Sequence, residues 1–151
     1  MARERTRSLR SRALSLLARR EHSRAELTRK LVPHVQEGEN LEAVLDDLAA
    51  RGWLSDARFA EQVARAKARR YGPFKLAQYL KSCGVGEESA AAGLRAAGDE
   101  GHASLEAIWR SRFRERPADD RERARHVRFL QGRGFPIEDI LRFLKERSPR
   151  P

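Results

Sequence analysis

Cysteine, aromatic residues and long apolar runs are all scarce in this chain. Cys83 is the one cysteine among 151 residues, which excludes an intrachain disulfide framework and a multi-cysteine zinc site. Aromatic residues make up 7% of the chain, and no apolar run approaches the roughly 20 residues that a membrane-spanning helix needs. We therefore expect no membrane protein and no disulfide-rich secreted domain, and a place in the reducing cytoplasm fits the single thiol.

Motifs of enzymatic chemistry are missing as well. The sequence contains neither GxGxxG nor GxxxxGK[ST], the glycine-rich phosphate loops, and no GxSxG nucleophile motif. Its four histidines (His22, His34, His102 and His126) are scattered, with no pair at i, i+4. We expect them at the surface or at helix ends and not as metal ligands. The sequence thus predicts no catalytic site, no metal and no cofactor.

Positive charge is what the chain has in abundance. Lys and Arg number 32 against 22 Asp and Glu, a net charge of +10. The charge alternates along the chain, with +6 in residues 1–20, −4 in 21–50, +6 in 51–83, −4 in 84–108 and +6 in 109–151. A row of helical units with one basic and one acidic surface would produce this alternation, and so would ordinary solvated helix faces.

Apolar residues recur at helical spacing, and no alternating run indicates a strand. Residues 41–48 place four apolar side chains on one helix face, with Asn40 suited to cap that helix and Gly52 to end it. Further predicted starts and stops are a capping box from Ser23 to Glu26, a cap at Ser55, first-turn prolines Pro73 and Pro136, and stops at Gly84 and Gly134. We predict nine helices and no sheet.

An internal repeat is visible when residues 59–94 are shifted by 50 positions. Phe59 then matches Trp109, Leu80 matches Leu130 and Gly84 matches Gly134. The first segment aligns with three extra residues between positions 32 and 39. The sequence predicts an all-α protein of three tandem three-helix repeats, an elongated and curved solenoid. The expected units are residues 7–53, 54–98 and 99–147, with joints at 51–55 and 98–101, a disordered basic tail at 1–6 and a frayed end at 148–151.

Basic residues provide the positive signal for a binding surface. They crowd the end of the fourth predicted helix and form strips in the second and third repeats, which suits phosphates or an acidic protein surface. At the helix end they also complement the helix dipole, a purely structural role. Trp53, Trp109, Phe59 and Tyr79 are interpreted as core residues in apolar stripes. The candidate contact residues are Arg65, Lys67, Arg69, Arg70, Lys75, Lys81, Arg121, Arg125 and Arg128.

Three segments resemble one protein family. The segment Gly52-Trp-Leu-Ser-Asp-Ala-Arg-Phe-Ala60 resembles the G-[YFW]-L-[DNS]-D-x-R-[FY]-A signature of the RecX family, the bacterial regulators of the RecA recombinase. Residues 71–85 are similar to its G-P-x-[RK]-[IL]-x-x-x-L-x-x-[KR]-G-[IV] element, and residues 13–27 to its opening A-L-x-x-L segment. Residues 125–144 resemble its last repeat. Ser82 and Cys83 depart from the charged pair that is usual before the glycine.

The resemblance implies a fold of three three-helix repeats and a protein that binds the RecA filament on single-stranded DNA. Family members usually restrain filament assembly, ATP hydrolysis, strand exchange and the coprotease activity of the SOS response, and so act in homologous recombination and DNA repair. We expect a cytoplasmic monomer that contacts single-stranded DNA weakly or through the filament, and no membrane. Two alternatives stay open: a basic helical protein that acts mainly by occupying DNA, and an unrecognised enzyme.

Overall fold

Helices account for all the regular structure in the computed structural model, which describes residues 7–98 and 105–146. Within these ranges there are nine α-helices, one short 3₁₀ helix and no strand. The predicted tail 1–6, most of the joint 98–101, His102 and the predicted frayed end 148–151 lie outside the described residues. The elements are α1 (Leu9–Arg19), α2 (Arg24–Leu31), η1 (Val32–His34), α3 (Leu41–Ala50), α4 (Asp56–Lys67), α5 (Pro73–Ser82), α6 (Glu87–Ala97), α7 (Leu105–Arg112), α8 (Asp120–Gly132) and α9 (Ile137–Glu146).

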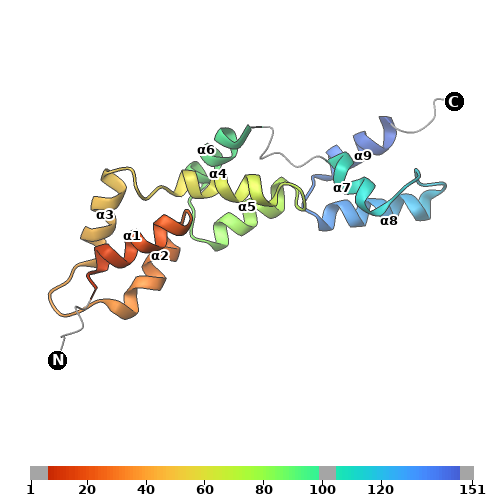
Figure 1. Ribbon diagram of the computed structural model, residues 1–151. Helices are drawn as coiled ribbons and strands as arrows, with labels where there is room; N and C mark the ends of the chain where they lie inside the picture. The colour runs from red at the N-terminus through yellow and green to blue at the C-terminus, as the bar shows by residue number, and fades with distance from the viewer. Residues whose placement is uncertain (1–6, 99–104, 147–151) are drawn as a thin grey trace.

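The helices form three groups in a row (Figure 1). Repeat 1 (α1–α3) lies at one end, repeat 3 (α7–α9) at the other, and repeat 2 (α4–α6) between them. The prediction of an all-α protein built from three tandem three-helix repeats is therefore confirmed. The row is elongated, so each repeat offers much of its surface to solvent or to a partner.

Helix ends follow the local sequence signals. Asn40 accepts a hydrogen bond from the amide of residue 43, and Ser55 caps α4 in the same way. Gly84 and Gly134 end helices with positive φ values of 79° and 97°, as predicted. The capping box at Ser23 is only half formed: its hydroxyl accepts the amide of residue 26, but the Glu26 carboxylate pairs with an arginine instead.

Each repeat has its own apolar core. In repeat 1 the core includes Leu27 and Leu31, in repeat 2 Phe59 and Leu80, and in repeat 3 residues from all three helices. Within repeat 2, α4 and α6 pack so closely that a Cβ on Gly93 would lie 2.4 Å from the Ala60 Cβ. The core clusters do not merge, so the repeats must be held together by other contacts. The repeat 1 core contains Leu9, Ala13, Leu27, Leu31, Leu45, Leu48 and Leu54.

The two boundaries between repeats are built alike. At each boundary, the turn between the last two helices of one repeat lies on the start of the second helix of the preceding repeat. At the first boundary, the Ser23 hydroxyl donates to the Cys83 carbonyl at 2.8 Å. At the second, the Gly72 amide donates to the Arg133 carbonyl, and the Phe74 amide donates to the Gly134 carbonyl at 2.9 Å. We call these contacts the first and second joints; they are distinct from the chain segments 51–55 and 98–101 that connect the repeats in sequence.

Candidate partner and nucleic-acid surface

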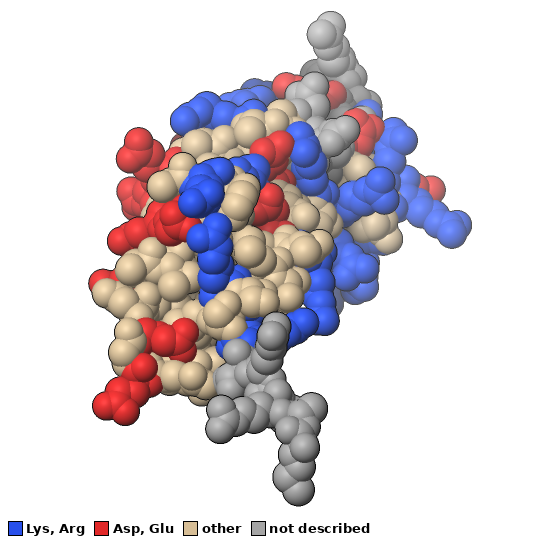
Figure 2. All heavy atoms as spheres, turned by 60° about the vertical axis from the view of Figure 1, so that its left-hand side comes forward, with Lys and Arg blue, Asp and Glu red and all other residues tan. Residues whose placement is uncertain are grey.

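Charge is distributed unevenly over the molecular surface. In Figure 2, most of the visible Lys and Arg side chains lie toward the right-hand side and most Asp and Glu side chains toward the left. Of the nine candidate contact residues, Lys67 is partly buried and the other eight are exposed. The structure places them in two groups, one on repeat 2 and one on repeat 3.

The repeat 2 group combines lysines with tyrosines. Lys75 and Tyr79 are four residues apart within α5, so they are about one helical turn apart and lie on the same side of the helix. The Lys67 Nζ, from the last turn of α4, lies 4.5 Å from the centre of the Tyr79 ring. The Lys75 Nζ lies 5.1 Å from the centre of the Tyr71 ring. These contacts hold two ammonium groups against aromatic faces by cation–π attraction.

This group lines a hollow that continues across the first joint. The hollow on repeat 2 has a volume of about 390 Å³. It shares Lys67, Tyr79 and Ser82 with a neighbouring hollow of about 690 Å³. The second hollow reaches repeat 1, where Arg29 on α2 forms part of its wall. We call the two together the joint trough; its polar and aromatic wall residues include Arg20, Glu26, Arg29, Lys67, Tyr71, Lys75, Tyr79 and Ser82.

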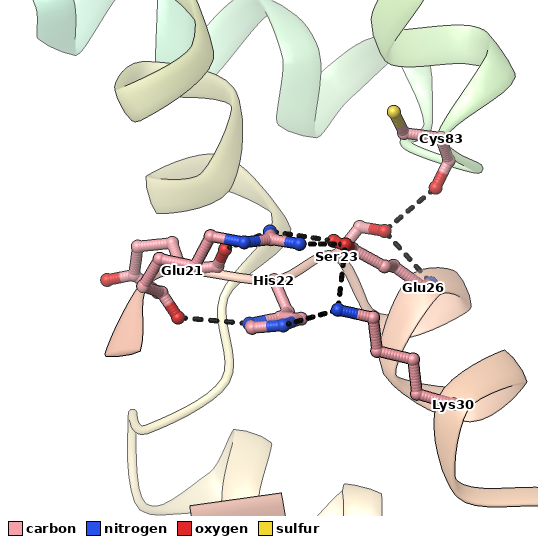
Figure 3. Close-up of polar contacts among 7 residues, drawn as sticks. Glu21, His22, Ser23, Glu26, Lys30 and Cys83 are labelled. Atoms are coloured by element: carbon pink, nitrogen blue, oxygen red, sulfur yellow. Dashed lines mark hydrogen bonds and ion pairs between the residues drawn. The ribbon is translucent and has the colours of Figure 1, made fainter. Parts of the chain in front are cut away.

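A polar network fixes the repeat 1 side of the trough (Figure 3). Glu26 pairs with Arg20 and lies 3.6 Å from the Lys30 Nζ. The hydrogen bond from Arg20 holds the pKa of Glu26 below its usual value. The carboxylate is therefore ionised and its charge is offset by two cations. It does not repel an anion in the trough as a free carboxylate would.

His22 belongs to this network. It lies just after the end of α1, as the predicted helix-end position has it, but it is buried and not at the surface. A lysine ammonium can only donate, so His22 Nε2, 3.2 Å from the Lys30 Nζ, is the acceptor. Nδ1 then carries the proton and donates to the Arg20 carbonyl at 3.0 Å. Burial lowers the pKa of His22, which keeps the ring neutral. The ring thus ties the end of α1 to α2 beside the first joint.

The repeat 3 group follows α8. Arg121, Arg125 and Arg128 share an exposed face of this helix, as their spacing predicts. The Arg125 guanidinium lies 5.8 Å from the centre of the Phe113 ring. Phe113 is also part of the wall of a hollow of about 980 Å³ at the end of α7. The remaining wall residues are Trp109, Arg110, Arg114, Glu115, Arg116, Pro117 and Ala118.

His126, behind this face, lies within α8 and is buried, so the predicted surface or helix-end position is wrong for this histidine. It is 5% exposed, and its ring stacks on Phe113 with the ring centres 3.7 Å apart. Trp109 Nε1 donates to His126 Nδ1 at 3.0 Å. An indole can only donate, so Nδ1 is unprotonated. Burial lowers the pKa of His126, in keeping with a neutral ring.

Two aromatic residues predicted to be core are exposed. Tyr79 is 41% exposed in the joint trough, and Trp53 is 44% exposed. The positive φ of Gly52 reverses the chain, so Leu54 takes the buried position and Trp53 points outward. Arg10 and Arg51 lie 5.7 and 5.4 Å from the centre of the Trp53 ring. The same prediction is confirmed for Phe59 and Trp109, which are buried.

Arg133 is a residue that the sequence argument missed. Its guanidinium lies 5.3 Å from the centre of the Phe129 ring and donates to the Arg70 carbonyl at 3.1 Å across the second joint. Its place after Gly132 at a helix end gave no local signal of a contact with repeat 2.

Among the described residues, no three His, Cys, Asp or Glu side chains lie close enough together to hold a metal ion. Within the same residues, no helix combines the length and the apolar character needed to cross a bilayer.

Comparisons with known proteins agree on one family. Models of the first, second and third RecX three-helix domains match residues 10–48, 55–94 and 99–144. Proteins named regulatory protein RecX from Ralstonia pickettii and Leptothrix cholodnii are 43% and 45% identical over 137 and 138 residues. These alignments cover 91% of this chain and 86% and 88% of the relatives.

A solved structure supports the fold. A crystal structure of regulatory protein RecX matches with a TM-score of 0.69 at 20% identity, over 92% of this chain and 72% of the other. At that identity the likeness concerns the arrangement of helices. Together with the domain matches and the curated relatives, it leads to one conclusion: the chain belongs to the RecX family of regulatory proteins.

Proposed function

We propose that this protein binds the RecA filament on single-stranded DNA and modulates it, usually by restraint. The affected activities are filament assembly, ATP hydrolysis, strand exchange and SOS coprotease activity. The observation that carries the proposal is membership of the RecX family through all three repeats. The relatives are named as regulatory proteins, in keeping with a role that needs no catalytic site of its own.

The physical mechanism is differential binding. A ligand shifts an equilibrium only if it prefers one state, and a bound bridge between neighbouring filament subunits prefers the state in which both contacts fit. An elongated row of repeats suits such a bridge. We propose that it acts as a cytoplasmic monomer through Arg65, Lys67, Arg69, Arg70, Lys75, Lys81, Arg121, Arg125 and Arg128.

A second candidate function is restraint by occupying DNA directly. The unbalanced charge of +10 and the basic joint trough favour attraction to phosphates. The two functions differ in how many protein molecules they need, because coating a strand requires far more molecules than acting on filament subunits or ends.

The deciding experiment is ATP hydrolysis by the cognate RecA on single-stranded DNA, with this protein titrated from far below the recombinase concentration. Strong loss of activity at a small molar fraction supports action on the filament. Loss only at concentrations that coat the DNA would refute it in favour of strand occupancy. No effect on hydrolysis, assembly or strand exchange at any concentration would refute both.

The repeat 3 strip has its own test. Arg125→Glu combined with Arg128→Glu should weaken filament binding while leaving the helix content intact, because both side chains are exposed. The matched control is Arg142→Glu with Lys145→Glu on exposed positions of α9. Equal binding by the two double variants would remove the α8 strip from the proposed contact surface.

A further inference from the structure

We infer that the joint trough is a binding site for single-stranded DNA, in which Lys67 and Lys75 bind backbone phosphate and Tyr79 stacks on a base. The inference extends the proposed function, because it gives the regulator its own hold on the strand that the filament covers. It concerns the isolated protein, so its oligonucleotide-binding test needs no recombinase.

No carboxylate forms an ion pair with Lys67 or Lys75 among the described residues. Both ammonium groups instead lie near the Tyr71 ring, with Lys67 Nζ 6.0 Å and Lys75 Nζ 5.1 Å from its centre. Two like charges gathered on one ring without a counterion favour an anion between them. Since aromatic contacts hold both side chains, little ordering is left for the ligand to impose.

Tyr79 is 41% exposed although its helix neighbours Leu76 and Leu80 are buried. Burial of its inner part and the neighbouring Cys83 thiol raise the pKa of the Tyr79 phenol, so the ring is neutral at physiological pH. A base can lie against the exposed part of a neutral ring. Lys67, held 4.5 Å from the centre of that ring, is then close enough to meet the phosphate of the same nucleotide.

The trough runs from α5 across the first joint to α2, where Arg29 adds a cation that has no ion pair among the described residues. The negative charge of Glu26, the carboxylate in its wall, is already offset by the ion pairs with Arg20 and Lys30. A strand in the trough therefore meets basic and aromatic groups in succession. That combination binds single strands without sequence preference, whereas in a duplex the base faces are covered by stacking.

The experiment measures fluorescence anisotropy of two labelled probes at several salt concentrations. One probe is a 15-nucleotide oligothymidylate, and the other is an abasic deoxyribose-phosphate chain of the same length. The wild-type protein should bind the thymidylate more tightly. Lys67→Gln and Lys75→Gln should each weaken binding of both probes and reduce the slope of log K against log salt by about 0.7, the value for one lost phosphate contact.

The tyrosine gives a different signature. Tyr79→Leu should weaken thymidylate binding about fivefold or more and keep the salt slope. It should weaken abasic binding much less, because Lys67 keeps its contact with the Tyr71 ring. Phe74→Leu is the matched control, since Phe74 is exposed on the same helix but lies outside the trough wall. Lys145→Gln is the control for loss of one exposed charge. Lys67→Arg keeps the charge and should restore the slope, which separates phosphate contact from a folding defect.

Three results would overturn the inference. The first is equal binding of the two probes by the wild type. The second is a salt slope for both lysine variants that matches Lys145→Gln. The third is a loss of filament restraint in the lysine variants with oligonucleotide binding intact, which would make the trough a protein-binding surface and leave the proposed function standing.

Discussion

Alanine substitutions at Gly134 and Gly72 test the second joint, and the same substitution at Gly52, which lies outside the joint, is the control for backbone strain. At Gly134, φ is +97° and an added Cβ would lie 2.6 Å from the Lys75 amide nitrogen, so alanine there is both strained and obstructed. At Gly72, φ is not positive, and the added Cβ would lie 2.7 Å from the Gly134 carbonyl oxygen, so the obstruction acts alone. At Gly52, φ is +75° with nothing within 4 Å, so the backbone strain acts alone.

The magnitudes follow from these contacts. A left-handed conformation costs a residue with a Cβ about 1–2 kcal/mol, and overpacking costs about 1–3 kcal/mol. We expect Gly52→Ala to lower the free energy of unfolding by about 1 kcal/mol, because a stiffer unfolded chain offsets part of the strain. Gly72→Ala should cost about 1–3 kcal/mol from overpacking, and Gly134→Ala, which adds the same net strain as Gly52→Ala, about 2–4 kcal/mol. The overpacking part of these costs cannot exceed the free energy that the second joint contributes to stability, since the two repeats can separate and relieve the obstruction.

The assay combines urea denaturation, followed by circular dichroism, with small-angle X-ray scattering. Denaturation gives the three free energies. Scattering should show a larger radius of gyration for Gly72→Ala and Gly134→Ala, in which the joint is forced open, but not for Gly52→Ala. If Gly134→Ala is no more destabilising than Gly52→Ala and scatters like the wild type, the second joint is not the close backbone contact described above.

Three further predictions concern the cores, the first joint and pH. Leu80→Ala, at a fully buried position of repeat 2, should cost about 2–5 kcal/mol by denaturation; a cost below 1 kcal/mol would contradict its place in that core. Ser23→Ala loses a helix cap and the hydrogen bond across the first joint, so it should cost more than Ser55→Ala, which loses a cap alone; equal costs would show that the joint bond contributes nothing. Because the pKa of His126 is lowered in the folded state, the unfolded chain binds more protons just below pH 6.5, and stability should fall as the pH falls through that range. His126→Asn should reduce this pH dependence in urea titrations at several pH values, and an unchanged dependence would exclude His126 as its source.

Local signals in the sequence predicted local structure well. The cap at Asn40 and the stop at Gly84 depend on one side chain or one φ angle, so a few neighbouring residues determine them. The core positions Leu27 and Leu31 follow from helical spacing, since one face of a helix must be buried. The same reasoning predicted the fold class, because the repeats preserve these signals at a similar interval, apart from the extra residues between positions 32 and 39.

Contacts between distant segments were not predictable in this way. Trp53 was predicted to be core but is exposed, because the chain reversal at Gly52 turns it outward. His22 is buried because the neighbouring helix α2 covers it. The joints depend on backbone carbonyls such as that of Cys83, which every residue type carries and no pattern marks. The joint trough likewise required the tertiary structure. The sequence analysis named Lys67 and Lys75 as contact residues but did not predict that they lie against the rings of Tyr79 and Tyr71.

The narrow joints have a mechanical consequence. Each joint links a turn to a helix start through a few hydrogen bonds, while the apolar cores lie separately within the repeats. Bending the row therefore stretches short, polar links and leaves the packed interiors unstrained. A partner whose spacing differs slightly from that of the repeats would deflect the links first. We therefore expect the joints to bend more easily than the repeats, so that the chain would follow a long curved surface while each repeat keeps its own core.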